Sequence, residues 1–130
     1  MTNEQKVQHW IDLADRDINT AEFNVNGGHH LFGVYLCHQA VEKIFKAYFA
    51  KTMEETPPYT HDLVGLAQKT GIFEEMSEEQ KDFVRELNPF NIEARYPEYK
   101  GQLAKKLTDE TSKEILKQAK EILQWTKSKI

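Results

Sequence analysis

The fold that we predict for this chain rests on residues 31–50, LFGVYLCHQAVEKIFKAYFA, which form its most apolar stretch. The stretch has the length of an α-helix of about five turns. Its five polar residues fall within roughly 140° of the helix circumference, and they are His38, Gln39, Glu42, Lys43 and Lys46. A helix that is apolar over more than half its girth must be covered from more than one side. We therefore expect residues 31–50 to form the central helix of a bundle.

The first predicted helix precedes this stretch. Apolar side chains recur every three or four residues from Val7 to Val25, which predicts an amphipathic helix over about residues 3–25. Thr2 and Gln5 have the spacing of a capping box, and Gly27-Gly28 ends the pattern. The link to the central helix is short, so the two helices should be antiparallel neighbours.

A short helix is predicted after the central one. Pro57-Pro58 closes the central helix region, because proline cannot continue a helix. Thr60 then suits the N-cap of a helix over His61–Thr70. Gly71 marks its end.

Two more helices are predicted in the second half of the chain. Capping-box spacings that start at Ser77 and at Thr111 predict helices over about residues 78–87 and 109–128. Residues 90–101, FNIEARYPEYKG, read as an irregular loop that is rich in tyrosine and charge. The predicted fold class is all-α, an antiparallel up-and-down bundle of four long helices plus a short helix.

Length and composition are those of one soluble domain over residues 1–130. Cys37 is the single cysteine, which excludes an intramolecular disulfide, and its apolar helix predicts a buried, unreactive thiol. One cysteine and scattered histidines give no zinc-binding pattern, so we predict no metal site and no cofactor. No signal-peptide run and no membrane-spanning stretch is visible, which favours a cytoplasmic protein without membrane attachment.

Charge is unevenly distributed along the chain. The net charge of −4 argues against a general nucleic-acid coat protein. Residues 1–94 carry a net charge of −8, whereas residues 95–130 carry +4. The C-terminal quarter could therefore present a local positive surface, although a solvated lysine-rich helix face explains the same pattern.

The polar residues of the central helix form the first candidate site. His38 and Glu42 are four residues apart and share one helix face, with Gln39 and Lys43 beside them. One interpretation is a polar pocket between helices that hydrogen-bonds a nucleotide or a protein partner. The alternative is a satisfied polar network where the helix meets its neighbours or a second copy of the chain.

Two further motifs contain groups that could take part in chemistry. Thr60 and Asp62 are explained by helix capping, which leaves His61 available for another role. Arg95 can bind a phosphate bidentately, and the neighbouring Tyr96 and Tyr99 can stack on bases. In the alternative interpretation, Arg95 pairs with nearby carboxylates and the tyrosines pack on the bundle. No phosphate-binding glycine loop and no Ser–His–Asp set can be assembled from the sequence.

These motifs in combination resemble the HEPN family (higher eukaryotes and prokaryotes nucleotide-binding). The similarity runs from about Lys6 to Ile130. The residues that carry it are Trp10, Ala14, Asp17 and Ala21, the stretch His38–Lys43 with Lys46-Ala47, Thr60–Leu63 with Leu66, and Arg95-Tyr96-Pro97.

The resemblance implies a helical bundle that is commonly a homodimer. Many prokaryotic members act with a minimal nucleotidyltransferase as a toxin–antitoxin pair, in which the HEPN protein is the toxin, a metal-independent RNase. The RNase members carry an arginine that is followed, after four to six residues, by a histidine at a dimer cleft. The two residues act on the scissile phosphate and its 2′-hydroxyl.

This chain departs from the RNase pattern. Arg95 is the counterpart of the family's arginine, but Lys100, Gly101 and Gln102 occupy the positions where the histidine would fall. No histidine follows His61. Tyr99 could act in its place, although tyrosine ordinarily has a pKa near 10 and is a poor base at pH 7. The departure favours binding over catalysis.

Three hypotheses follow. The first is the HEPN component of a nucleotidyltransferase-linked system, which binds nucleotide, RNA or the partner enzyme through His38, Gln39, Glu42, Lys43, His61, Arg95 and Tyr96. The second is an atypical metal-independent RNase that uses Arg95 with Tyr99. The third is a non-catalytic structural dimer in which the polar cluster fixes the packing register.

Overall fold

The computed structural model describes residues 1–130 except for the side chain of Ala94. Its elements are, in chain order, α1 (Asn3–Asn26), α2 (His30–Met53), α3 (Leu63–Thr70), α4 (Ile72–Glu75), α5 (Glu78–Leu87), the 3-10 turns η1 (Asn88–Phe90) and η2 (Ile92–Ala94), α6 (Pro97–Lys105) and α7 (Asp109–Lys127). The described part of the chain contains no strand, which confirms the all-α prediction.

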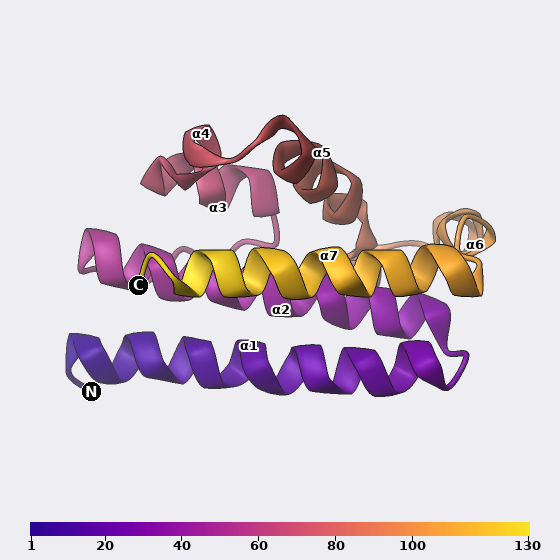
Figure 1. Cartoon of the computed structure of the whole chain (residues 1–130), viewed down its shortest axis with the longest axis horizontal. Helices are drawn as coiled ribbons and strands as arrows, with labels where there is room; N and C mark the ends of the chain where they lie inside the picture. Colours follow the sequence, from indigo (N-terminus) through magenta and orange to yellow (C-terminus); the bar gives the residue numbers. More distant parts are fainter.

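Three long helices pack against one another and form the main part of the bundle. Figure 1 shows α1, α2 and α7 lying along one another, with α3, α4 and α5 above them and α6 at one end. Helix α1 is antiparallel to both of its long neighbours, whereas α2 and α7 run in the same direction. The segment from α3 to α6 returns the chain to the end where α2 begins. The fourth main helix, α5, has only 10 residues.

Helix α2 is the centre of the fold, as the apolar stretch predicted. It contacts α1, α7, α3 and α6, and Ile44 and Phe45 are fully buried. At Gly33 the backbones of α1 and α2 approach closely, because an added Cβ would lie 2.6 Å from Val25 Cγ2. Cys37 is buried in this helix, and burial raises the pKa of its thiol to about 12. A thiol with that pKa is almost entirely protonated at neutral pH and is a poor nucleophile.

The helix ends agree with the sequence prediction at two caps and differ at two others. The capping boxes at Thr2 and Ser77 are both present. Thr111 does not cap α7, because Thr108 is the N-cap and its hydroxyl accepts the Thr111 N–H at 3.0 Å. Helix α3 begins at Leu63 with Asp62 as its cap, so the predicted start at His61 is wrong.

The prediction of an irregular loop over residues 90–101 is also wrong. The segment contains η2 and the first half of α6. Pro97 lies at the start of α6, where its fixed φ suits the first turn and its missing N–H costs nothing. Gly101 lies within the same helix, and Leu103 anchors it in the core. Neither Pro97 nor Gly101 therefore breaks a helix here.

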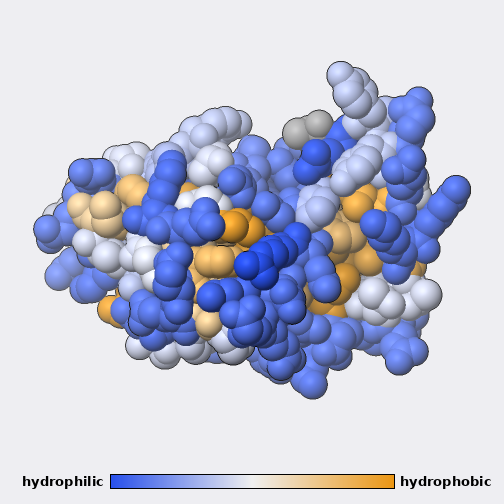
Figure 2. Space-filling view, turned by 90° about the horizontal axis from the view of Figure 1, so that it is seen from above, coloured by the Kyte–Doolittle hydropathy of each residue, from blue (hydrophilic) through white to orange (hydrophobic). Residues whose placement is uncertain are grey.

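The face that carries α3, α5 and α6 is uneven in polarity. Figure 2 shows apolar atoms near its middle and toward both ends, including the end where α6 lies. At that end an apolar cavity of about 320 Å³ lies between α5, α6 and α7, and Leu87, Leu103 and Ile115 help to line it. None of the helices among the described residues is long and apolar enough to cross a membrane.

Candidate functional site

A polar surface cavity of about 440 Å³ brings together residues that are far apart in the sequence. Its lining comes from the link before α3, from α5, from the turns that follow it and from the start of α6. The lining residues are His61, Asp62, Arg85, Asn88, Pro89, Asn91, Arg95 and Tyr99. Two guanidinium groups, an imidazole and two amides in one cavity form a donor-rich site for an oxyanion such as phosphate.

Asn88 fastens two walls of this cavity to each other. Its side-chain N–H donates to Asp62 Oδ1 at 3.0 Å, and its Oδ1 accepts the Leu63 N–H at 2.8 Å. Asp62 also accepts the Gly65 N–H at 3.1 Å as the cap of α3. The hydrogen bond from Asn88, followed by that from Gly65, lowers the pKa of Asp62. The Asp62 carboxylate is therefore engaged in capping and bridging.

His61 is held at the cavity wall by a buried carboxylate on α2. Glu42 Oε1 lies 2.8 Å from His61 Nδ1, and Glu42 Oε2 accepts from Lys46 Nζ at 3.1 Å. The Glu42 side chain is 4% exposed and that of His61 is 38% exposed. A carboxylate at Nδ1 favours the proton on that nitrogen, so Nε2 carries the lone pair in the neutral ring. No hydrogen bond among the described residues uses Nε2 of His61.

Lys46 connects this network to the exposed ring of Tyr59. Its ammonium lies 5.4 Å from the centroid of the Trp10 ring and 5.9 Å from that of Tyr59. Both distances suit cation–π attraction. The Tyr59 ring also meets the His61 ring edge-on, with 5.5 Å between the centroids. The buried network therefore links α1 and α2 to the chain segment that enters α3.

Arg95 approaches the cavity from the segment between η2 and α6. Its Nε donates to the Pro89 carbonyl at 3.2 Å, and its guanidinium lies 5.1 Å from the centroid of the Tyr99 ring. Arg85 is paired with Asp82 at 3.1 Å and also lies over the Phe73 ring. Both arginines keep unused N–H donors, because each of these hydrogen bonds occupies one donor of five.

The residues predicted from the sequence are divided between this cavity and the interior. His61, Arg95 and Tyr99 line the cavity, whereas the 82% exposed Tyr96 is not part of its lining. His38 and Glu42 are buried. The two remaining predicted residues are on α2: Lys43 forms an ion pair with Asp17 of α1, and Gln39 Oε1 lies 3.3 Å from His38 Nδ1.

Sequence reasoning missed four residues in or beside the cavity: Tyr59, Arg85, Asn88 and Asn91. The sequence pattern marks Asn88 and its neighbour Pro89 only as a helix end. It offers Arg85 as a second arginine, but Phe90, Asn91 and Ile92 occupy the positions where the family's histidine would fall, so the sequence assigns Arg85 no role. Neither pattern indicates that helix α5 ends beside the segment that contains His61.

His38 is a buried imidazole whose protonation should be linked to folding. Burial lowers the pKa of His38 below its ordinary range, although the nearby Glu42 carboxylate opposes this effect. Its Nε2 has no hydrogen-bond partner among the described residues. Below the ordinary pKa of histidine, near 6.5, the unfolded chain binds a proton that the folded chain does not. Folding stability should therefore fall as the pH drops.

We expect acidification below about pH 6.5 to reduce the free energy of unfolding, by up to about 1.4 kcal/mol per pH unit from this group. Urea unfolding of the wild type and His38→Gln at pH 7.5, 6.5 and 5.5 measures the effect. The variant lacks the titrating group, so its stability should change less over this range. Equal slopes for the two proteins would exclude His38 as the cause.

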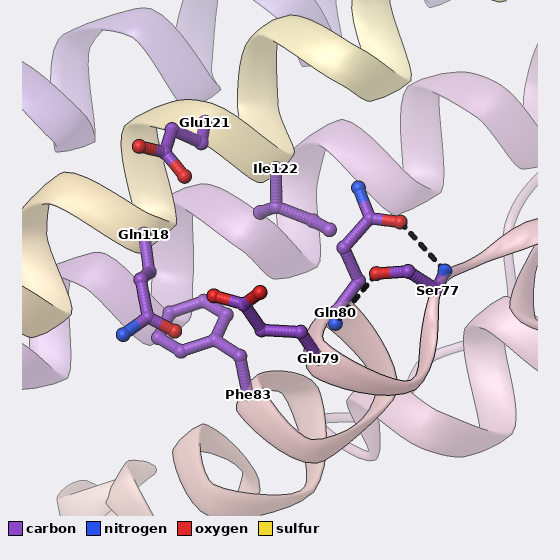
Figure 3. A pocket seen from close by; sticks show the side chains of 7 residues that line it. All are labelled: Ser77, Glu79, Gln80, Phe83, Gln118, Glu121 and Ile122. Carbon is purple, nitrogen blue, oxygen red and sulfur yellow. Dashed lines mark hydrogen bonds between the residues drawn. The ribbon is translucent and has the colours of Figure 1, made fainter.

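A third cavity is less suited to binding an anion. It measures about 350 Å³ and lies between the start of α5 and α7 (Figure 3). Glu79 and Glu121 line it, and none of its lining residues is cationic. Ser77 and Gln80 hydrogen-bond each other in the capping box, as the dashed lines show. This cavity would repel a phosphate group, in contrast to the cavity around Arg95.

No three His, Cys, Asp or Glu side chains in the described part of the chain converge in a way that could hold a metal ion. The residues that line the cavity around Arg95 act through their own side-chain groups. They can donate hydrogen bonds, supply positive charge and exchange a proton at an imidazole.

Comparison with known proteins identifies the family. Residues 7–129 match the HEPN domain family. The chain belongs to the HEPN family. The resemblance inferred from the sequence motifs is thereby confirmed. The match covers the cavity, all of α2 and α7, and all of α1 except its first turn.

A solved structure has the same fold as this HEPN domain. The crystal structure of TT1696 from Thermus thermophilus matches with a TM-score of 0.80. The match covers 96% of this chain and 98% of that chain, at 18% sequence identity. At this identity the likeness establishes the fold alone. No curated protein matches the sequence.

Proposed function

We propose that this HEPN protein is one component of a nucleotidyltransferase-linked two-component system of the toxin–antitoxin type. In this proposal it binds a nucleotide or RNA by its phosphate in the cavity lined by His61, Arg85 and Arg95. Membership of the HEPN family supports the first part. The observation that carries the second is the convergence of two guanidinium groups, one imidazole and two amides on one cavity.

Binding is tested with a short 5′-phosphorylated single-stranded oligoribonucleotide and with ATP, by fluorescence anisotropy and calorimetry at two salt concentrations. Arg95→Ala should weaken binding by about tenfold or more, since a charge-assisted contact to phosphate contributes roughly 1.5–3 kcal/mol. Arg16→Ala, which removes an exposed arginine from α1, is the matched control and should bind as the wild type does. Equal affinities of all three proteins would refute the assignment of the cavity.

The proposal also includes protein partners, namely a second copy of the chain and a minimal nucleotidyltransferase. Family membership supports both. Light scattering of the purified protein measures whether it is a dimer. A mass of one chain at micromolar concentration would contradict the proposed homodimer. A nucleotidyltransferase encoded beside the gene is the partner to test by co-purification. Arg95→Ala tests whether the same cavity takes part.

A second candidate function is metal-independent RNA cleavage, and one observation favours it. The histidine that the sequence pattern lacks after Arg95 has a counterpart in His61, which lines the same cavity and is oriented by Glu42. Imidazole is a better base at neutral pH than the Tyr99 phenol that the sequence suggested. His61 would take the proton of a 2′-hydroxyl, whose oxygen attacks the phosphorus. The bond to the 5′-oxygen breaks, and that oxygen takes a proton from water.

Cleavage is tested on RNA in the presence of a chelator, with His61→Asn and Tyr99→Phe compared in parallel. If His61 is the base, His61→Asn should lose cleavage by about 10²-fold or more while it still binds RNA, and Tyr99→Phe should remain active. Loss in Tyr99→Phe alone would favour the tyrosine. An RNA with one 2′-deoxy nucleotide at the cleavage position should bind and stay intact. If the wild type binds RNA without cutting it, the binding function stands and the catalytic one falls.

A further inference from the structure

Tyr59 is the most exposed of the large hydrophobic side chains in the described part of the chain, with 92% of its surface accessible. It lies in the segment between α2 and α3, outside the three cavities described above. An exposed ring of this size contributes little to the core, because burial is the source of hydrophobic stabilisation. Its position beside the polar cavity therefore calls for a separate explanation.

The ring is exposed but held in place. Pro57 and Pro58 precede it and restrict the backbone that leads to it. The Lys46 ammonium lies 5.9 Å from its centroid, and the His61 ring meets it edge-on at 5.5 Å. Lys46 and His61 are themselves both bound to the buried Glu42 carboxylate. An aromatic ring fixed in this way loses little conformational entropy when a ligand stacks on it.

We propose that Tyr59 is a stacking platform for one base of a single-stranded RNA whose phosphate occupies the neighbouring cavity. His61 connects the two subsites, because its ring touches Tyr59 and also lines the cavity with Arg85 and Arg95. Base–aromatic stacking accepts any base, since every base offers a π-face. The combination predicts a preference for unpaired nucleotides with little preference for sequence. This inference rests on the proposed phosphate-binding function of the cavity.

The experiment compares two 5′-phosphorylated oligoribonucleotides by fluorescence anisotropy, one intact and one that lacks the base of its first nucleotide. The wild type should bind the intact RNA more tightly, by about 5- to 150-fold for one stacked base. Tyr59→Ala should lose that difference and bind both RNAs with the affinity that the wild type shows for the abasic one. Tyr59→Trp should keep the preference. Phe23→Ala, which removes a 78% exposed ring from α1, should leave both affinities unchanged.

Each of the other possible results contradicts either the stacking inference or the proposed function. If Tyr59→Ala weakens binding of the intact and abasic RNA equally, the ring acts through His61 and is not a platform. If the wild type binds both RNAs equally well, the stacking inference fails and the phosphate site stands. If the wild type binds neither RNA, both the stacking inference and the proposed function fail. Circular dichroism of Tyr59→Ala shows whether the fold is intact, which the exposure of the ring leads us to expect.

Discussion

Replacing Glu42 with alanine is expected to lower the free energy of unfolding by about 3–5 kcal/mol. The carboxylate is buried and accepts from Lys46 at 3.1 Å, while its other oxygen lies 2.8 Å from His61 Nδ1. Its removal leaves the buried Lys46 ammonium without its anion, and desolvating an unpaired charge is costly. Urea unfolding at pH 7.5 measures the change.

The double variant Glu42→Leu/Lys46→Met shows whether Glu42→Ala is destabilised by an unpaired charge or by lost packing. It removes both charges, and replacing a buried ion pair by apolar residues of similar volume is often neutral or stabilising. We therefore expect it to recover most of the stability that Glu42→Ala loses. If the double variant is as unstable as the single one, the ion pair is not the reason. Its RNA affinity should still be reduced, because His61 loses the acceptor that orients it.

Alanine at Gly33 is expected to destabilise the fold by about 1–3 kcal/mol, the usual cost of overpacking a well-packed core. The new Cβ would lie 2.6 Å from Val25 Cγ2 and 3.0 Å from the Val25 backbone nitrogen. Valine is stiff at χ1, so neither atom can move aside without shifting α1 against α2. Thermal and urea unfolding measure the loss.

The same substitution at Gly101 is the matched control and should have the opposite sign. Gly101 also lies inside a helix, α6, and a Cβ there meets nothing within 4 Å. Alanine should therefore stabilise the protein by about 0.5–1 kcal/mol, because it loses less backbone entropy than glycine in a helix. If both variants are stabilised, the α1–α2 contact can relax and our interpretation of Gly33 is wrong.

The fold was predictable where the sequence pattern is local and strong. The apolar girth of α2, the periodicity of α1 and the capping boxes at Thr2 and Ser77 all describe interactions within a few residues. Helix α6 was missed because Pro97 and Gly101 were interpreted as residues that interrupt a helix. Pro97 is compatible with a helix because it lies at the first position of α6. An argument from composition alone does not take that position into account.

The candidate site was only half predictable. His61, Arg95 and Tyr99 were identified as available side chains, but their convergence depends on how α3, α5 and α6 pack. A search for a histidine within a fixed distance after Arg95 in the sequence cannot find one that precedes it by 34 positions. Helical spacing placed Glu42 and His38 correctly on one face of α2, yet it could not tell that both side chains are buried.

The order of the helices has a bearing on how the chain is made. Synthesis delivers α1 and α2 first, and they can pair as a local hairpin. Helix α7 is delivered last, although it packs against both of them, and its Lys127 pairs with Asp15 across 112 positions of sequence. Until then, the side of α2 that α7 covers faces water. From the completion of α2 until α7 has been made, a nascent chain of this protein thus exposes an apolar strip that chaperones of the hydrophobic-binding kind can bind.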